Sequence, residues 1–425
     1  MFQMFSIEAT TLNVIQLGIG FLFMLFAFNS QSSIEETVIS HFSTRGIVDN
    51  HDGYTGLSIS YAVFTVTNFV AAPIVEFLGA RWSIVLGGLT YAVFQAGFLF
   101  LNKVFLYFSS GLLGFGAAVL WTGQGKYLSL NSTEHTAGKH SGLFWALSQT
   151  CLIGGGIFLF VVFNASTDMS DASIYVIYSV FTGMTVIGAV ILACLRVPNR
   201  HEKSVENRLS HLEVMKSTLY LLTTKRMWLL TISFIYAGIM LSFWSGIYPT
   251  CVASTQKLGV NTRILLALNT ICLGLGQVVS GLLFGLLGDK TRRFGRDGII
   301  ILGTCVHLLA FVAIFINFPA DAPLGKTNGT GLIEPSVPIA LFCGFLLGFG
   351  DACWNTQIYA FLAVEYSGES AQAFSVFKFF MHLFTCVAFY YSKVVELQWH
   401  LIILTVFGVA ASVSFFVVER MTKLN

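Results

Sequence analysis

Twelve long apolar runs divide this chain, and each is about long enough to cross a hydrocarbon core of ~30 Å. The composition of 55% hydrophobic and 10% charged residues agrees, because a soluble chain of this length would carry roughly 25% charged residues. We therefore predict an all-α membrane protein whose constant partner is the lipid bilayer. The predicted spans are 11–29, 54–75, 82–101, 105–121, 142–163, 174–195, 227–249, 264–287, 298–318, 338–361, 373–391 and 397–418.

One segment occurs twice, once in each half of the chain. Residues 112–124 read LLGFGAAVLWTGQ, and residues 346–357 read LLGFGDACWNTQ. The LLGFG blocks lie 234 positions apart and the Trp-x-x-Gln pairs that follow lie 233 apart, so a single-residue insertion or deletion separates the copies. Five consecutive identities followed by a matched pair indicate an internal duplication.

The longest polar segment, residues 196–226, separates six predicted spans from the other six. We predict an N-terminal bundle over 1–195, a cytoplasmic basic linker over 196–226 and a C-terminal bundle over 227–425. Apolar residues recur in the linker at three- and four-residue steps, which predicts an amphipathic helix that lies on the inner leaflet and tethers the two bundles. These residues are Val205, Leu209, Leu212, Met215, Leu219 and Leu222.

The distribution of Lys and Arg between the loops predicts the orientation. With a cytoplasmic N-terminus, the inner segments hold sixteen Lys and Arg residues and the outer segments hold six. Cytoplasmic loops carry the excess of basic residues, so both termini are expected inside, in a plasma membrane or an endomembrane. The glycosylation sequons at Asn164 and Asn328 then lie outside, and the sequon at Asn131 lies in the cytoplasm and stays unused.

Each half carries a charged turn after its second span, and both turns resemble a cytoplasmic motif of the major facilitator superfamily. The first copy keeps the spacing with Glu76, Gly79 and Arg81. The second copy is looser and consists of Asp289, Lys290, Gly295 and Arg296. A carboxylate at one helix end can form an ion pair with a basic residue at the end of the adjacent helix. Such a pair stabilises one conformation until the two bundles rotate against each other. Alternatively, the basic residues of the second copy only follow the positive-inside rule.

A narrower resemblance extends over essentially the whole chain. It is carried by residues 120–147, 243–259, 346–357 and 374–380, and the Trp-Thr-Gly-Gln-Gly block at Trp121 is its most specific part. These segments resemble the uncoordinated-93-like family of the major facilitator superfamily. The resemblance implies a twelve-transmembrane-helix major facilitator fold with two pseudo-symmetric six-helix bundles. It leaves the activity open, because some relatives are regarded as potassium-channel regulators or trafficking chaperones.

In this fold the first, fourth, seventh and tenth helices line a central cavity, where the duplicated segments would face one another. Asp351 stands where the first copy has Ala117, well inside the bilayer. A carboxylate at that depth costs ~2.5–3.5 kcal/mol unless it faces water or a partner. Lys378 is the expected partner, and His382 shares its helix face. The three can bind an ion or relay a proton; the alternative is an internal salt bridge with Lys378 extended to the inner interface.

Four more residues are candidates for the substrate or ion pathway. Asn355 follows Asp351 by four residues and shares its face. Gln124 either binds a solute or ties two helices together by a hydrogen bond. Trp145 and Trp244 either face a cation or an organic solute, or pack against neighbouring helices.

Motifs for several chemistries are absent from the sequence. It contains no G-x-x-x-x-G-K-[ST] phosphate loop and no zinc-protease spacing, and its eight Cys show no metal-ligand spacing. We expect no enzymatic activity, no metal, no cofactor and no nucleic-acid partner. The sequence favours a secondary carrier of a small solute or ion that works by alternating access. The alternative is a regulatory subunit of an ion channel or a trafficking chaperone, which would bind another membrane protein.

Overall fold

The computed structural model describes residues 8–49, 52–165, 170–196, 210–259, 261–286, 295–392 and 394–423. Within these ranges, twelve helical segments are long and apolar enough to cross a membrane, which confirms the predicted all-α class. Four residues of the sequence predictions, Val205, Leu209, Asp289 and Lys290, lie outside the described residues.

The spans follow one another in two sets of six. The first set is α1 (Ala9–Ser43), α2 (Asp52–Leu78), α3 (Ala80–Gly97), α4 (Lys103–Asn131), α5 (Ala137–Ala165) and α6 (Asp171–Ala193). The seventh span joins α8 (Lys225–Ser242), the π-helical turn η3 (Phe243–Ile247) and α9 (Tyr248–Ser254). The others are α10 (Thr262–Leu286), α12 (Gly295–Asn317), α13 (Val337–Glu365), α14 (Ser370–Tyr391) and α15 (Leu397–Lys423), and α7 (His211–Leu221) lies between the sets.

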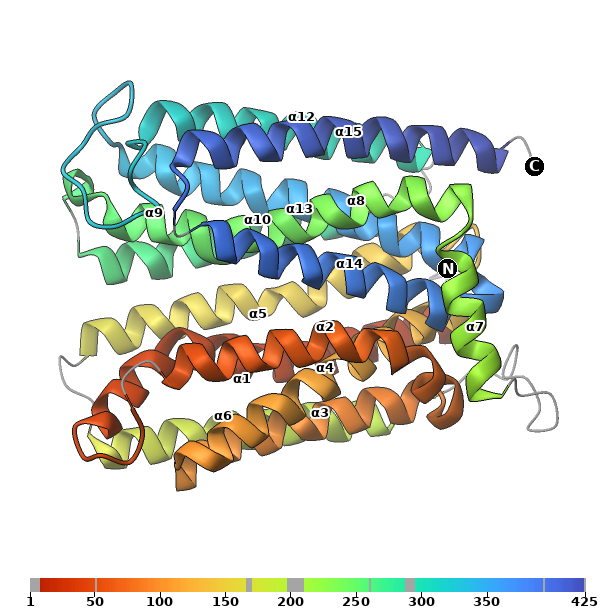
Figure 1. Ribbon diagram of the computed structural model, residues 1–425, viewed down its shortest axis with the longest axis horizontal. Coiled ribbons are helices and arrows are strands. Elements are labelled where there is room, and N and C mark those ends of the chain that lie inside the picture. The colour runs from red at the N-terminus through yellow and green to blue at the C-terminus, as the bar shows by residue number, and fades with distance from the viewer. Residues whose placement is uncertain are drawn as a thin grey trace, which may run out of the picture.

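The two sets repeat the same packing. In the first, α1 packs on α5 and α6, α3 packs on α4 and α6, and α2 packs on α4. In the second, α8 packs on α14 and α15, α12 packs on α13 and α15, and α10 packs on α13. Figure 1 shows the two sets as the lower and upper parts of the molecule. The duplication seen in α4 and α13 therefore extends over each half.

Among the helix pairs that join the halves, α5 with α10 and α2 with α14 make the most extensive contacts. Gly142 of α5 faces the backbone of Gly281 and Gly285 of α10, and a Cβ at Gly142 would collide with it. Small residues let transmembrane helices approach closely, and glycine is needed at this contact.

Helix α7 lies across one end of the spans, where α1 begins and α15 ends (Figure 1). We call this the α7 end and the opposite one the α9 end. Ser210 and Glu213 form a capping box, and the hydrogen bonds from Ser210 lower the pKa of the Glu213 carboxyl below its ordinary value. Val214 packs in an apolar cluster with α2, and Ser217 donates to Glu369 at 2.7 Å. The predicted linker helix thus contacts both halves.

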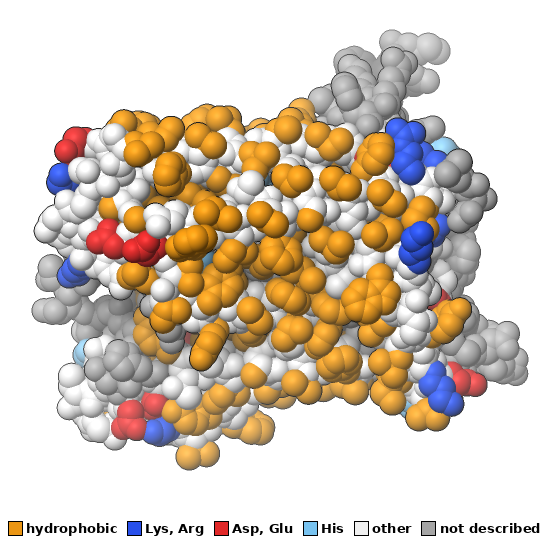
Figure 2. Space-filling model, turned by 45° about the horizontal axis from the view of Figure 1, so that its top comes forward, with side chains coloured by type: hydrophobic (Ala, Val, Ile, Leu, Met, Phe, Trp, Pro, Cys, Tyr) orange, Lys and Arg blue, Asp and Glu red, His pale blue; other side chains and the backbone are white. Residues whose placement is uncertain are grey.

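The surface fits a membrane environment. Figure 2 shows hydrophobic side chains over the middle of the visible face and charged side chains at its two ends. An apolar band of this kind, with charge restricted to its borders, is typical of a protein that spans a bilayer.

Candidate substrate cavity

A cavity of about 240 Å³ lies between the two halves. Both duplicated segments line it, with Ala117 and Trp121 from α4 and with Asp351 and Asn355 from α13. Other aromatic lining residues are Phe28, Tyr61, Phe64, Tyr91, Trp145 and Trp244, and other polar ones are Asn29, Ser60, Gln149, Ser245, Lys378 and His382. A mostly apolar cavity with a few polar groups is the usual form of a small-molecule site.

The cavity continues toward the α9 end. It shares lining residues with a second hollow of about 350 Å³, which extends to Pro249, Asn269 and Phe389. Two of the shared residues, Leu57 and Ser245, are exposed. The hollow therefore leads from the duplicated segments to the surface at the α9 end.

At the α7 end, contacts between the halves close the cavity. Ser129 of α4 donates to the carbonyl of Ala363 in α13 at 2.6 Å, and Ser375 of α14 donates to a backbone carbonyl of α2. Gly125 lies so close to the ring of Phe374 that a Cβ would collide with it. The cavity is therefore open toward the α9 end and closed at the α7 end.

Asp351 is buried in the cavity wall and is 3% exposed. The indole nitrogen of Trp244 donates to its Oδ1 at 3.2 Å, and Oδ2 has no hydrogen-bond partner within the described part of the chain. The amide of Asn355 donates to the backbone carbonyl of Asp351 at 3.1 Å and lies close enough to interact with the carboxylate as well. One carboxylate oxygen is therefore left without a donor.

Lys378 is also 3% exposed, and aromatic rings surround its ammonium group. Its Nζ lies 4.6 Å from the ring centre of Trp121, 4.9 Å from that of Phe377 and 5.2 Å from that of Tyr359. Among the described residues no carboxylate pairs with it within 4.0 Å, although it interacts electrostatically with Asp351. Lys378 is thus held by cation–π contacts, and neither the expected direct salt bridge nor an extension to the interface is formed.

His382 lies one helical turn from Lys378 and faces the same cavity, as its spacing predicts. Its Nδ1 is 2.9 Å from the carbonyl of Lys378. Because a carbonyl only accepts, Nδ1 carries the hydrogen, and Nε2 of the neutral ring is left as an acceptor. The ring packs on Phe64 at 3.8 Å between centres.

The remaining pathway candidates divide into two groups. Trp145 lines the cavity, and its indole nitrogen donates to Gln277 at 2.8 Å, which ties α5 to α10. Gln124 is fully buried and does not line the cavity, and neither of its amide atoms has a hydrogen-bond partner in the described ranges. The structure therefore brings together Asp351, Lys378, His382, Asn355, Trp145 and Trp244, and it leaves Gln124 outside the cavity.

Sequence reasoning missed the aromatic residues around Lys378. Trp121 comes from α4, far from Lys378 in sequence, and Tyr359 comes from α13, the helix before α14. A usable signal was the spacing of seven residues between Gly114 and Trp121. Seven residues are about two helical turns, so both residues lie on the face of α4 that lines the cavity.

The first charged turn forms its ion pair with a residue the sequence did not suggest. The carboxylate of Glu76 lies 2.7 Å from Nζ of Lys126 in α4. Arg81 instead donates to the carbonyl of Leu195 at 3.3 Å. Gly79 has a φ of 77°, in the region that favours glycine, and this explains the glycine of the motif.

The described part of the second charged turn makes a similar connection. Gly295, with a φ of 72°, precedes Arg296, which pairs with Glu365 of α13 and Glu419 of α15, both at 3.0 Å. In the part of the chain that the structure describes, both charged turns therefore tie helix ends together within one half.

Asn328 is exposed in the loop between α12 and α13 at the α9 end, where an enzyme can reach it. The side chain of Asn164 lies outside the described residues. Over the residues that the structure describes, no group of His, Cys, Asp and Glu is arranged to hold a metal ion.

Comparison with known proteins gives a consistent result. A family model described as "Ion channel regulatory protein UNC-93" matches residues 44–416. The UNC93-like protein MFSD11 of Xenopus tropicalis is 40% identical, with 96% of each chain covered. The human protein unc-93 homolog A is 24% identical, with 89% of this chain and 87% of the relative covered.

Solved structures show the same fold at low sequence identity. The major facilitator superfamily transporter FucP in its outward conformation matches with a TM-score of 0.69 at 13% identity, over 96% of this chain and 98% of FucP. The human organic anion transporter MFSD10 matches with a TM-score of 0.65 at 14% identity, over 97% of this chain and all of MFSD10. The predicted twelve-helix major facilitator fold is confirmed.

Proposed function

The chain belongs to the UNC-93 family and is a membrane transporter-like protein, and from this premise we propose that it is a secondary carrier of a small solute or ion. Its bundles, residues 1–195 and 227–425, move against each other about the cavity, and residues 196–226 link them. Alternating access of this kind is how facilitator folds expose one central site to the two sides of a membrane in turn.

One observation carries this proposal: the cavity between the repeated halves contains a carboxylate and an ammonium that do not neutralise each other directly. Asp351 has an oxygen without a donor in the described part of the chain, and the ammonium of Lys378 contacts the rings of Trp121, Phe377 and Tyr359 and the thioether of Met381. Charged groups inside a membrane protein are costly unless they are used or paired. We assign Asp351 to binding or coupling the ion, and Lys378 and His382 to the solute.

The charged turns support rigid-body motion. Glu76 with Lys126, and Arg296 with its two carboxylates, fasten helix ends inside each half. We propose that they keep each half rigid as the halves rock. Lys126→Gln should then lower the thermal stability of the protein, and equal melting temperatures of the variant and the wild type would contradict this role.

We propose that the α7 end is cytoplasmic, with both termini on that side. The excess of Lys and Arg in the segments assigned to that side supports this orientation. Asn328 at the α9 end would then receive a glycan. Removal of N-glycans should increase the electrophoretic mobility of the wild type. If Asn164 is unused, it should leave the mobility of Asn328→Gln unchanged. A glycan at Asn131 would reverse the assignment of the two sides.

A ligand screen tests the carrier function. The purified protein is heated with ions, amino acids, nucleosides, organic cations and organic anions, beside Asp351→Asn and the control Glu334→Gln, which alters an exposed carboxylate at the α9 end. A ligand at a hundred times its dissociation constant adds ~2.7 kcal/mol of stability. Stabilisation that is lost in Asp351→Asn and kept in Glu334→Gln supports the proposal, and the same ligand should then enter proteoliposomes.

A second function, regulation of an ion channel, is favoured by the description of the matching family model. In that case the cavity is a remnant of a carrier fold, and a partner membrane protein binds the outer surface. Absence of any stabilising ligand while Asp351→Asn stays equally folded would favour this second function over the carrier.

A further inference from the structure

An apolar groove of about 160 Å³ lies at the α7 end, on the seam between the halves. It is formed by α2, α14 and the linker helix α7, and its apolar walls are Phe69, Met215, Leu219, Leu222, Val376 and Phe379. Its three polar lining residues each donate a side-chain hydrogen bond to a backbone carbonyl, and the amide oxygen of Asn68 has no partner among the described residues. The groove is separate from the central cavity and shares no lining residue with it.

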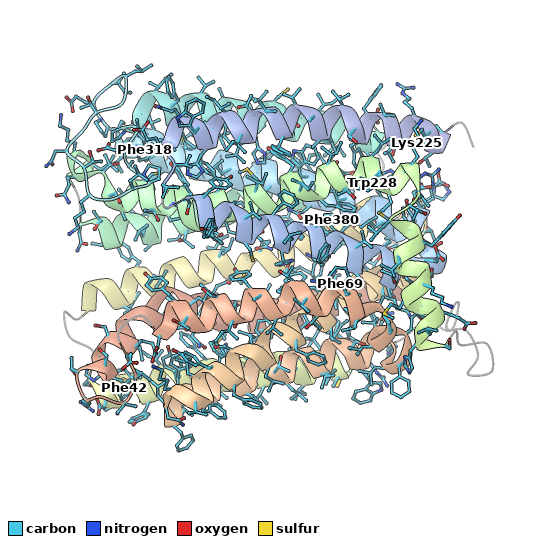
Figure 3. All side chains as sticks on the ribbon, in the orientation of Figure 1. Phe42, Phe69, Lys225, Trp228, Phe318 and Phe380 are labelled. Carbon is cyan, nitrogen blue, oxygen red and sulfur yellow. The ribbon has the colours of Figure 1, made fainter. Side chains whose placement is uncertain are left out.

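The groove faces the lipid. Phe69 is 42% exposed, Leu219 is 50% exposed and Met215 is 36% exposed, although all three are apolar. Figure 3 places Phe69 between α2 and α14. Since α2 and α14 cross the bilayer, a groove between them that is open on its outer side contacts hydrocarbon chains.

Exposed basic residues lie on helix α7, which forms one wall of the groove, and at the start of α8, at the same end of the spans. Helix α7 lies across the ends of the spans, as an interfacial helix does, and Lys216 of α7 and Lys225 at the start of α8 are exposed. The linker 196–226 contains seven Lys and Arg residues and three Glu residues. Each basic residue near a membrane surface contributes ~1 kcal/mol of attraction to anionic lipids.

We propose that this groove binds one acyl chain of an anionic phospholipid from the leaflet at the α7 end, with its phosphate against Lys216, which follows the groove residue Met215 in α7. A dry apolar cavity of ~150 Å³ holds benzene, so a groove of about 160 Å³ accommodates a short length of one chain. The chain contacts α2 from one half, α14 from the other, and the linker helix between them. A bound lipid therefore stabilises the arrangement that is closed at the α7 end.

Native mass spectrometry of the full-length protein tests the acyl-chain site. The probes are phosphatidylglycerol and phosphatidylcholine with identical chains. The wild type should retain one phosphatidylglycerol molecule, and Leu219→Trp, which fills the groove, should weaken its binding about tenfold. The matched control is Leu212→Trp, on the same exposed side of α7 but outside the groove, and it should bind like the wild type. Equal binding by the two variants would overturn the proposal.

The headgroup is tested by the same measurement. The wild type should bind phosphatidylglycerol about tenfold more tightly than phosphatidylcholine, and Lys216→Gln should remove this preference. Lys326→Gln, at an exposed position at the α9 end, is the control and should keep it. Equal binding of both lipids by the wild type would overturn the anionic assignment. If Leu219→Trp does not fold, Met215→Trp fills the groove from the neighbouring turn and decides the question.

Discussion

Helices α4 and α13 begin their duplicated segments in the same way and end them differently. Gly114 of α4 lies against the backbone of α2, and Gly348 of α13 lies against the backbone of α10. Because α2 and α10 are equivalent helices of the two halves, the two glycines make the same contact. The LLGFG stem is therefore conserved between the halves as a site where helices approach closely.

After the stem, the two helices differ in phase. Trp121 follows Gly114 by seven residues and lines the cavity, whereas Trp354 follows Gly348 by six residues and packs on Tyr236 at 4.9 Å between ring centres. Both segments are continuous α-helix, so one residue fewer turns the tryptophan by ~100°. The residue at the equivalent place in α13 is Asn355.

This difference makes the two walls of the cavity chemically unequal. Ala117 and Asp351 both follow the stem glycine by three residues, and both line the cavity. Helix α4 therefore supplies a methyl group and an indole, and α13 supplies a carboxylate and an amide. Residues of the same type in the two copies therefore do not occupy equivalent positions in the fold. Residues at the same spacing from the stem glycine, Gly114 or Gly348, do.

The largest expected effect distinguishes the two tryptophans. Trp354→Ala removes a fully buried side chain and should lower stability by ~3–5 kcal/mol. Trp121→Ala should cost clearly less, because Trp121 is only partly buried and faces the cavity. Thermal unfolding in detergent measures both, with Trp82→Ala as an exposed control. Equal losses at Trp121 and Trp354 would show that the two positions are equivalent after all.

A swap between the walls tests whether Ala117 and Asp351 are equivalent places. Asp351→Ala should abolish the stabilisation of ~2.7 kcal/mol expected from a ligand at a hundred times its dissociation constant. Adding Ala117→Asp should restore part of it, because the carboxylate returns to the same cavity from the opposite wall. Thermal shifts with and without ligand measure this, and no recovery in a folded double variant would argue against the equivalence.

The stem glycines should respond alike. Gly114→Val and Gly348→Val each force a side chain into a facing helix backbone, and each should cost ~1–3 kcal/mol. Gly183→Val, where no atom lies within 4 Å of the new Cβ, is the control. A large loss at one stem glycine with none at the other would break the symmetry that the packing indicates.

The smallest effect concerns the two glutamines of the copies. Gln124→Leu should be neutral or stabilising by ~1 kcal/mol, because its amide is buried and has no partner among the described residues. Gln357→Leu should be slightly destabilising, since the Gln357 amide donates to Thr356 at 3.1 Å. Unfolding of both variants measures the difference, and a marked destabilisation by Gln124→Leu would indicate a partner in another conformation.

The sequence predicts the membrane class, the twelve spans and the burial of Asp351, because these depend on composition and local periodicity. It also predicts that Lys378 and His382 share a helix face, which needs only the helical repeat. It does not predict that Glu76 pairs with Lys126, or that aromatic rings surround Lys378, because those partners meet only when helices from different parts of the chain pack together. Such contacts depend on helix phase, which one inserted residue changes.

The π-helical turn η3 (Phe243–Ile247) changes the phase of a helix within one span. A π turn closes its hydrogen bonds over one residue more than an α-turn, so the helix after it is rotated relative to the helix before it. Trp244, inside the turn, binds Asp351, whereas Tyr248, just after it, donates to the carbonyl of Ala340 in α13. Deletion of one residue from η3 would turn Tyr248 away from its acceptor while the first part of the span stays in place. The seventh span is thus attached to α13 at two points that lie on either side of a change in helix phase, one at Trp244 and one at Tyr248.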